Sequence, residues 1–71
     1  MNRLFLDANI LFSAAYRSDA GLLQLWKVSD MMLCSSRYAL EEARINLTDA
    51  DQQVRLARLS ETVHLFEASH Q

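Results

Sequence analysis

Apolar residues along the chain fall into short blocks, some spaced like strands and others like helices. Residues 3–6 (Arg-Leu-Phe-Leu) and 31–34 (Met-Met-Leu-Cys) are apolar runs without polar alternation, which is typical of strands covered on both faces in a parallel sheet. Residues 62–66 (Thr-Val-His-Leu-Phe) have the composition of a third strand. The pattern therefore predicts three strands, the first two of them buried.

Between these strands the apolar residues recur at helical spacing. We expect four helices, over residues 8–16, 20–28, 37–47 and 49–60. Helix-start signals precede three of them, namely Ser18-Asp19, Ser35-Ser36 and the Thr48-x-x-Asp51 pattern. Alternating strands and helices predict a single α/β domain over residues 1–71, with a short parallel sheet and right-handed crossovers.

Composition narrows the class of protein. A length of 71 residues is near the lower limit for an independent core, and an apolar fraction of 51% excludes a disordered segment. Gly21 is the only glycine and there is no proline, so helices should dominate. A net charge of −2 provides no field that gathers nucleic acid non-specifically.

The same composition bears on the compartment. Cys34 is the only cysteine, which excludes a disulfide within the chain and fits a reducing cytoplasm. No stretch reaches the length of a membrane span, and the N-terminus makes a poor signal peptide because Asp7 interrupts its apolar run. We therefore expect a cytoplasmic protein.

Asp7 is the charge that the pattern leaves unexplained, because it lies between the apolar runs 4–6 and 10–12. Burying a carboxylate without partners costs several kcal/mol or forces its protonation. Asp7 would end a parallel strand, and ligand sites form at the carboxyl ends of such strands. Alternatively, it caps the helix over 8–16, whose N-terminus favours a negative charge.

The helix over 37–47 carries two adjacent acids that cannot share a face. At ~100° per residue, Glu41 groups with Arg37 and Arg44. These spacings predict ordinary solvated ion pairs. Glu41 thus needs no functional explanation, and Glu42 is the candidate.

Glu42 falls on the mostly apolar arc of this helix, between Tyr38, Ile45 and Asn46. A carboxylate on a buried arc needs a cation, hydrogen-bond donors or a metal ion. A buried arginine such as Arg3 or Arg17 is one alternative, and a metal ion is the other.

Asp7 and Glu42 together suggest a site for Mg²⁺ or Mn²⁺, which prefer oxygen ligands. Such an ion activates water and stabilises the charge that develops on a phosphodiester. Asn9 would orient the metal-bound water or a carboxylate through its amide. The alternative for Asn9 is a solvent-facing residue of the first helical turn.

These residues resemble the N-terminal half of a PIN domain. The resemblance rests on residues 4–11 (Leu-Phe-Leu-Asp-Ala-Asn-Ile-Leu), on Ser36, on residues 40–43 (Leu-Glu-Glu-Ala) and on Leu47. The family comprises metal-dependent ribonucleases, among them many toxins of bacterial toxin–antitoxin pairs. The resemblance implies a three-layer α/β fold, RNA as substrate and a cognate antitoxin protein as partner.

By this resemblance, Asp7 and Glu42 are metal-site acids. The resemblance covers nearly all of this chain but little more than half of a family domain, whose further acids follow the third strand. It thus implies an incomplete Mg²⁺ or Mn²⁺ ribonuclease site, completed by another segment or chain. The alternative is a non-catalytic interaction module derived from a PIN domain.

The family's sheet places the first strand centrally, next to the later segment. Without that segment, the edge of residues 3–6 would be exposed, and an open edge is a template for self-association. We therefore expect a homodimer with twofold symmetry.

Other chemistry-bearing side chains have structural explanations. No second His or Cys stands at metal-ligand spacing from His64 or His70. Trp26 is expected in the core. Arg55 and Arg58, one helical turn apart, are expected to form a solvated face, with a phosphate-binding track as the alternative.

Overall fold

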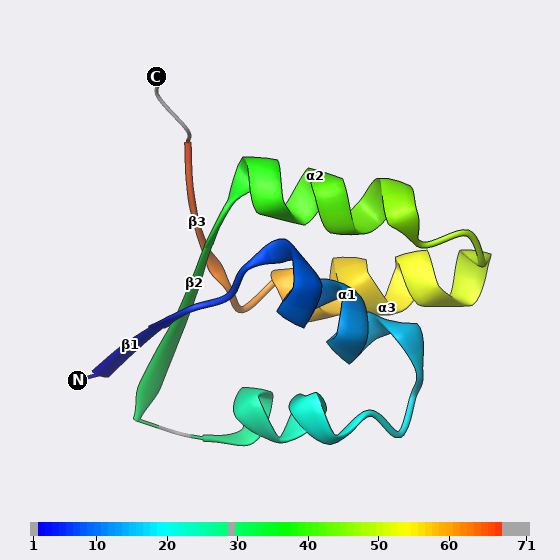
Figure 1. The fold of residues 1–71 in the computed structure, drawn as a ribbon. Helices are drawn as coiled ribbons and strands as arrows, with labels where there is room; N and C mark the ends of the chain where they lie inside the picture. Colours follow the sequence, from blue (N-terminus) through cyan, green and yellow to red (C-terminus); the bar gives the residue numbers. More distant parts are fainter. Residues whose placement is uncertain (1, 29, 68–71) are drawn as a thin grey trace.

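The computed structural model describes residues 2–28 and 30–67. Within them the chain forms a parallel sheet and four helices, which confirms the predicted α/β class (Figure 1). The elements are, in order, β1 (Asn2–Phe5), α1 (Ala8–Tyr16), the 3₁₀ helix η1 (Gly21–Lys27), β2 (Met31–Ser36), α2 (Arg37–Asn46), α3 (Ala50–Ser60) and β3 (His64–Phe66). His70 lies outside the described residues.

The sheet has the order β1-β2-β3, with β2 at its centre. Both neighbouring pairs are parallel, and the register places Leu4 beside Leu33 and Cys34 beside His64. No strand of residues 2–28 and 30–67 pairs with the outer side of β1. The first strand is therefore an edge strand, as expected from the sequence.

One face of β1 packs against the helices and the other is open. Leu4 of β1 and Leu6 just after it pack into the core that the helices form, where Leu6 is fully buried. Phe5 points the opposite way and is 54% exposed. The prediction that residues 3–6 are covered on both faces is wrong, because the core that the helices form lies against only one face of β1.

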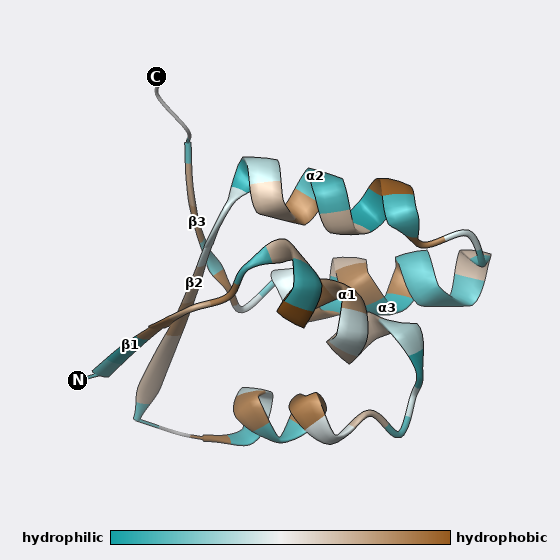
Figure 2. Ribbon diagram, viewed as in Figure 1, coloured by the Kyte–Doolittle hydropathy of each residue, from teal (hydrophilic) through white to brown (hydrophobic). Residues whose placement is uncertain are grey.

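The helices contribute most of the core. α1 packs against both α2 and α3, and the strands run along one side of the helices in Figure 1. The buried cluster is built from Leu6, Leu11, Ala15, Leu33, Ala39, Ala43, Leu47, Leu56 and Val63. Figure 2 shows that β1 is hydrophilic at its start and hydrophobic toward its end. Burial of each large apolar side chain contributes about 1.5–3 kcal/mol.

Helix starts follow the sequence in some places and not in others. The Ser36 hydroxyl accepts a hydrogen bond from the Ala39 amide at 3.0 Å and caps α2 as predicted. α3 is capped by Asp49, not by Thr48, and the Asp49 amide donates to the Gln52 side chain at 3.3 Å. The predicted start signal is therefore misplaced by one residue.

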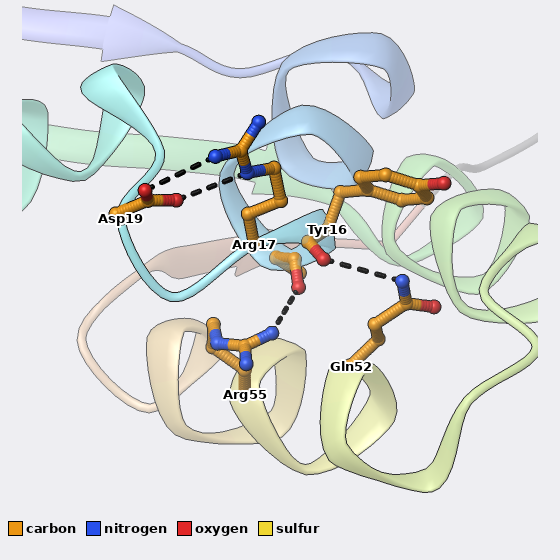
Figure 3. Close-up of polar contacts among 6 residues, drawn as sticks. Tyr16, Arg17, Asp19, Gln52 and Arg55 are labelled. Carbon is orange, nitrogen blue, oxygen red and sulfur yellow. Dashed lines mark hydrogen bonds and ion pairs between the residues drawn. The ribbon is translucent and has the colours of Figure 1, made fainter.

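The expected cap of the helix over 20–28 is also wrong. Ala20 occupies the N-cap of η1 and supplies no side-chain hydrogen bond. Asp19 instead pairs with Arg17 through two hydrogen bonds of 3.0 and 3.1 Å (Figure 3). The hydrogen bond and the charge of Arg17 lower the pKa of the Asp19 carboxyl.

The C-terminal end of α1 is held by side chains of α3 (Figure 3). The last carbonyls of a helix lack partners within the helix. Here the Arg55 guanidinium donates to the Ala15 carbonyl at 2.7 Å, and the Gln52 amide donates to the Tyr16 carbonyl at 3.2 Å. The prediction of a solvated face is wrong for Arg55, which joins two helices, and right for the exposed Arg58.

Candidate metal site

Asp7 is the N-cap of α1. Its Oδ1 accepts a hydrogen bond from the Ile10 amide at 3.0 Å, and its backbone is extended, with φ −81° and ψ 175°. The positive end of the helix dipole favours the charged carboxylate at this position. Asp7 is exposed, so the charge between two apolar runs carries no burial cost. The cap explains why the chain tolerates Asp7, and it leaves Oδ2 outside the described hydrogen bonds.

Glu42 lies in the middle of α2 and is exposed. Its neighbours on the same helical face, Tyr38 and Ile45, are 70% and 62% exposed. The prediction that this arc is buried is wrong. α2 turns the opposite side, with Ala39 and Ala43, into the core, because small residues let α2 approach α1 closely.

Neither arginine suggested as a partner of Glu42 forms an ion pair with it. Arg17 binds Asp19, and the ion pairs among residues 2–28 and 30–67 include no contact of Arg3. The Glu42 carboxylate is therefore available on the surface.

Glu41 behaves largely as predicted. It pairs with Arg44, whose Nε donates to Oε1 at 3.0 Å, and the second guanidinium nitrogen donates to the other carboxylate oxygen. The hydrogen bond with Arg44 lowers the pKa of the Glu41 carboxyl. Arg37 departs from the prediction, because it pairs with Glu67 beyond β3 at 2.9 Å.

Asp7, Asn9 and Glu42 line one open hollow of about 340 Å³, between the end of β1 and the helices α1 and α2. A second hollow of about 290 Å³ is lined in part by the same residues, Ala8, Asn9 and Glu42. We call the two together the acidic recess; its walls comprise Phe5, Asp7, Ala8, Asn9, Phe12, Ser36, Tyr38, Ala39, Glu42 and Asn46. The structure thus brings together all three predicted site residues.

Other residues of the acidic recess were not singled out from the sequence. Phe5 and Tyr38 contribute exposed aromatic rings beside the two carboxylates. Asn46 lines the far end, and its amide donates to the backbone carbonyl of Glu42 at 2.9 Å. Tyr38, Glu42 and Asn46 recur every four residues, and this spacing was the available signal that they share a helical face.

The oxygen donors of the acidic recess are of the kind that divalent cations bind, but they are too few for a complete metal site. Carboxylate and amide oxygens suit Mg²⁺ and Mn²⁺. The described part of the chain contains no group of three or more His, Cys, Asp or Glu side chains that could hold a metal ion. The acidic recess therefore offers two carboxylates to an ion, and Asn9 lies within reach of the same space.

Three further side chains do not line the acidic recess. Cys34 is buried, and His64 is exposed with its ring 4.8 Å from that of Phe66. Trp26 packs against the core, and its indole nitrogen donates to the Leu59 carbonyl at 2.9 Å. Among the described residues, no helix is long and apolar enough to cross a membrane.

Comparisons with protein-family models, with curated proteins and with solved structures give no match to this chain.

Proposed function

We propose that the chain is a PIN-like domain that carries part of a Mg²⁺- or Mn²⁺-dependent ribonuclease site. The observation that supports this proposal is the convergence of Asp7, Asn9 and Glu42 on one recess at the carboxyl end of β1. In a parallel sheet this end is where ligand sites form. The resemblance of residues 4–11 and 40–43 to the PIN family suggests the reaction, which is hydrolysis of an RNA phosphodiester.

The side chains have distinct roles in this proposal. Asp7 and Glu42 would hold the ion through their carboxylates, while the hydrogen bond from the Ile10 amide to Oδ1 fixes the orientation of the Asp7 carboxylate. Asn9 would orient a metal-bound water through its amide. A bound divalent ion would supply an activated water and would neutralise charge on the phosphodiester.

Two carboxylates make a weak site, because proteins that bind Mg²⁺ through few ligands rely on substrate phosphates for the rest. We infer that further acids come from another segment or chain. The partners in this proposal are RNA and a cognate antitoxin protein, in the cytoplasm.

The test is Mn²⁺-dependent cleavage of single-stranded RNA. We expect Asp7→Asn and Glu42→Gln each to lower the cleavage rate at least about a hundredfold, since each removes a charged ligand. Glu41→Gln is the matched control, because this neighbouring acid already pairs with Arg44, and it should cleave at the wild-type rate. Undiminished cleavage by Asp7→Asn would refute the assignment.

The open edge of β1 supports a second candidate, a non-catalytic interaction module. β1 carries the exposed Phe5 and pairs on only one side within the described residues. A homodimer with twofold symmetry, built by antiparallel pairing of two β1 strands, would satisfy this edge. Such a module should tolerate changes at Glu42 and fail when its strand edge is altered.

A further inference from the structure

The open edge of β1 presents a specific set of backbone groups. The Leu6 amide donates to the Cys34 carbonyl at 2.7 Å, so Leu6 directs its backbone groups toward β2. Backbone groups of successive strand residues point to opposite edges. Arg3 and Phe5 therefore direct both groups to the open edge. Asp7 directs only its amide there, because its carbonyl accepts a hydrogen bond from the Leu11 amide at 3.1 Å. The extended backbone of Asp7 continues this alternation past the end of the strand.

Arg3, Phe5 and Asp7 alternate with Leu4 and Leu6, so their side chains leave the chain on the face of β1 opposite the core. Arg3 and Asp7 are exposed, and Phe5 between them is 54% exposed. The order along the edge is thus cation, aromatic ring, anion. A twofold axis between the two central residues places the cation of one copy opposite the anion of the other, so this edge is complementary to itself.

Only one antiparallel register uses this complementarity. With Phe5 opposite Phe5 of a second copy, Arg3 of each copy lies directly opposite Asp7 of the other. A shift of two residues places Phe5 opposite Arg3 or opposite Asp7 and removes both charge pairs. Opposite charges directly across an antiparallel pair are favourable, as are paired aromatic rings.

We propose that two copies of this chain pair through β1 in this register, with Arg3 of each copy bound to Asp7 of the other. The Phe5 residues exchange two backbone hydrogen bonds, and each Asp7 amide donates to the Arg3 carbonyl across the axis. The two sheets join into one continuous sheet, and the open faces become neighbours.

This pairing regulates the proposed metal site. The Arg3 guanidinium occupies the carboxylate of Asp7 that the proposed function assigns to the ion, and this part of the inference rests on that function. Dimerisation and divalent-metal binding therefore compete for Asp7, and by thermodynamic linkage each weakens the other by the same factor. The metal-free chain is the dimer, and the metal-bound chain is the monomer.

The interface is small, because a single strand pair buries less surface than stable dimers require. We expect a dissociation constant on the order of 10 μM. Sedimentation equilibrium of the 71-residue chain up to about 300 μM, without divalent metal, measures it directly. A chain that stays monomeric over this range would overturn the proposal.

Charge reversal tests the register. We expect Arg3→Glu to weaken the dimer at least about tenfold, since it sets two like-charge pairs across the interface. Arg58→Glu makes the same change of charge on the exposed face of α3 and should leave the dimer unchanged. Asp7→Asn keeps a capping side chain on α1 and should also weaken the dimer. Equal affinities for Arg3→Glu and Arg58→Glu would contradict the register.

Mixing two charge-reversed variants tests the contact between Arg3 and Asp7 most specifically. Arg3→Glu and Asp7→Lys chains should each be poor homodimers, whereas an equimolar mixture restores two opposite-charge pairs and should dimerise. A mixture that remains monomeric while both chains show native circular dichroism would refute the Arg3–Asp7 contact.

Mn²⁺ separates this inference from the proposed function. Added Mn²⁺ should convert the wild-type dimer to monomer, and calorimetry on the monomeric Arg3→Glu chain should show Mn²⁺ binding. Absence of binding to Arg3→Glu would reject the metal site and leave the dimer standing. Binding to Arg3→Glu with a wild-type dimer indifferent to Mn²⁺ would reject the competition alone.

Discussion

Replacing Asp7 with Asn should weaken Mn²⁺ binding and leave the fold intact, whereas replacing it with Ala should weaken Mn²⁺ binding and also destabilise the fold. Asn caps helices as well as Asp does, so the hydrogen bond from the Ile10 amide can persist in Asp7→Asn. Ala has no acceptor, and we expect Asp7→Ala to lower the free energy of unfolding by about 1 kcal/mol relative to Asp7→Asn. Mn²⁺ affinity should fall at least about tenfold in both variants.

Urea unfolding measures the first effect and Mn²⁺ electron paramagnetic resonance the second. Asp30→Asn is a suitable control, since this exposed acid precedes β2 and therefore lies at the other end of the parallel sheet. It should change neither quantity. If Asp7→Asn retained full Mn²⁺ affinity, capping would be the whole role of Asp7.

Leu11→Ala is expected to have the largest effect on stability. Leu11 is fully buried on α1, within the core cluster where α1 meets α2 and α3. Truncation of such a leucine costs about 3 kcal/mol, through lost burial and the cavity left behind. At about 0.05–0.15 kcal/mol of stability per residue, a chain of this length has about 4–11 kcal/mol in total, so the substitution removes a large share of it. We expect the variant to unfold at a clearly lower urea concentration than the wild type.

Ile45→Ala provides the comparison, because Ile45 is 62% exposed on the outer face of α2. It should change the free energy of unfolding by less than about 0.5 kcal/mol. Circular dichroism during urea titration distinguishes the two variants. Similar losses in both would mean that Ile45 is buried in solution, for example against a second chain.

Local periodicity was sufficient to predict the number, order and type of the elements. Strand runs and helical spacing are properties of neighbouring residues, and the predicted bounds differ from the observed ones by one or two residues in most elements. It was harder to predict which side chains of a strand the helices bury. Phe5 is as apolar as Leu6, and only the placement of the helices decides that Leu6 is buried and Phe5 exposed.

Glu42 illustrates the same limit at the site. Its apolar neighbours Tyr38 and Ile45 suggested a buried arc, but α2 packs through its alanines and leaves that arc in solvent. Arg55 is the opposite case. Its sequence pattern predicts a surface cation, but its side chain donates a hydrogen bond to the carbonyl of Ala15, which is far away in sequence. Neither the exposure of Glu42 nor the contact between Arg55 and Ala15 can be inferred from the spacing of neighbouring residues.

The convergence of Asp7 and Glu42 was predictable, because one follows the end of a strand and the other lies on the helix that follows the neighbouring strand. The cap formed by Asp7 was likewise one of two stated alternatives, and the structure contains it. The number of further ligands was not predictable, since two acids in a recess are compatible with a metal site and with a plain surface.

The most direct measurement is a calorimetric titration of Mn²⁺ into the wild-type chain, beside Asp7→Asn and Glu42→Gln. We expect weak Mn²⁺ binding at one site in the wild type and no detectable binding in either variant, because one remaining carboxylate cannot hold the ion. No binding in the wild type, or binding that survives both substitutions, would contradict a metal site in the acidic recess.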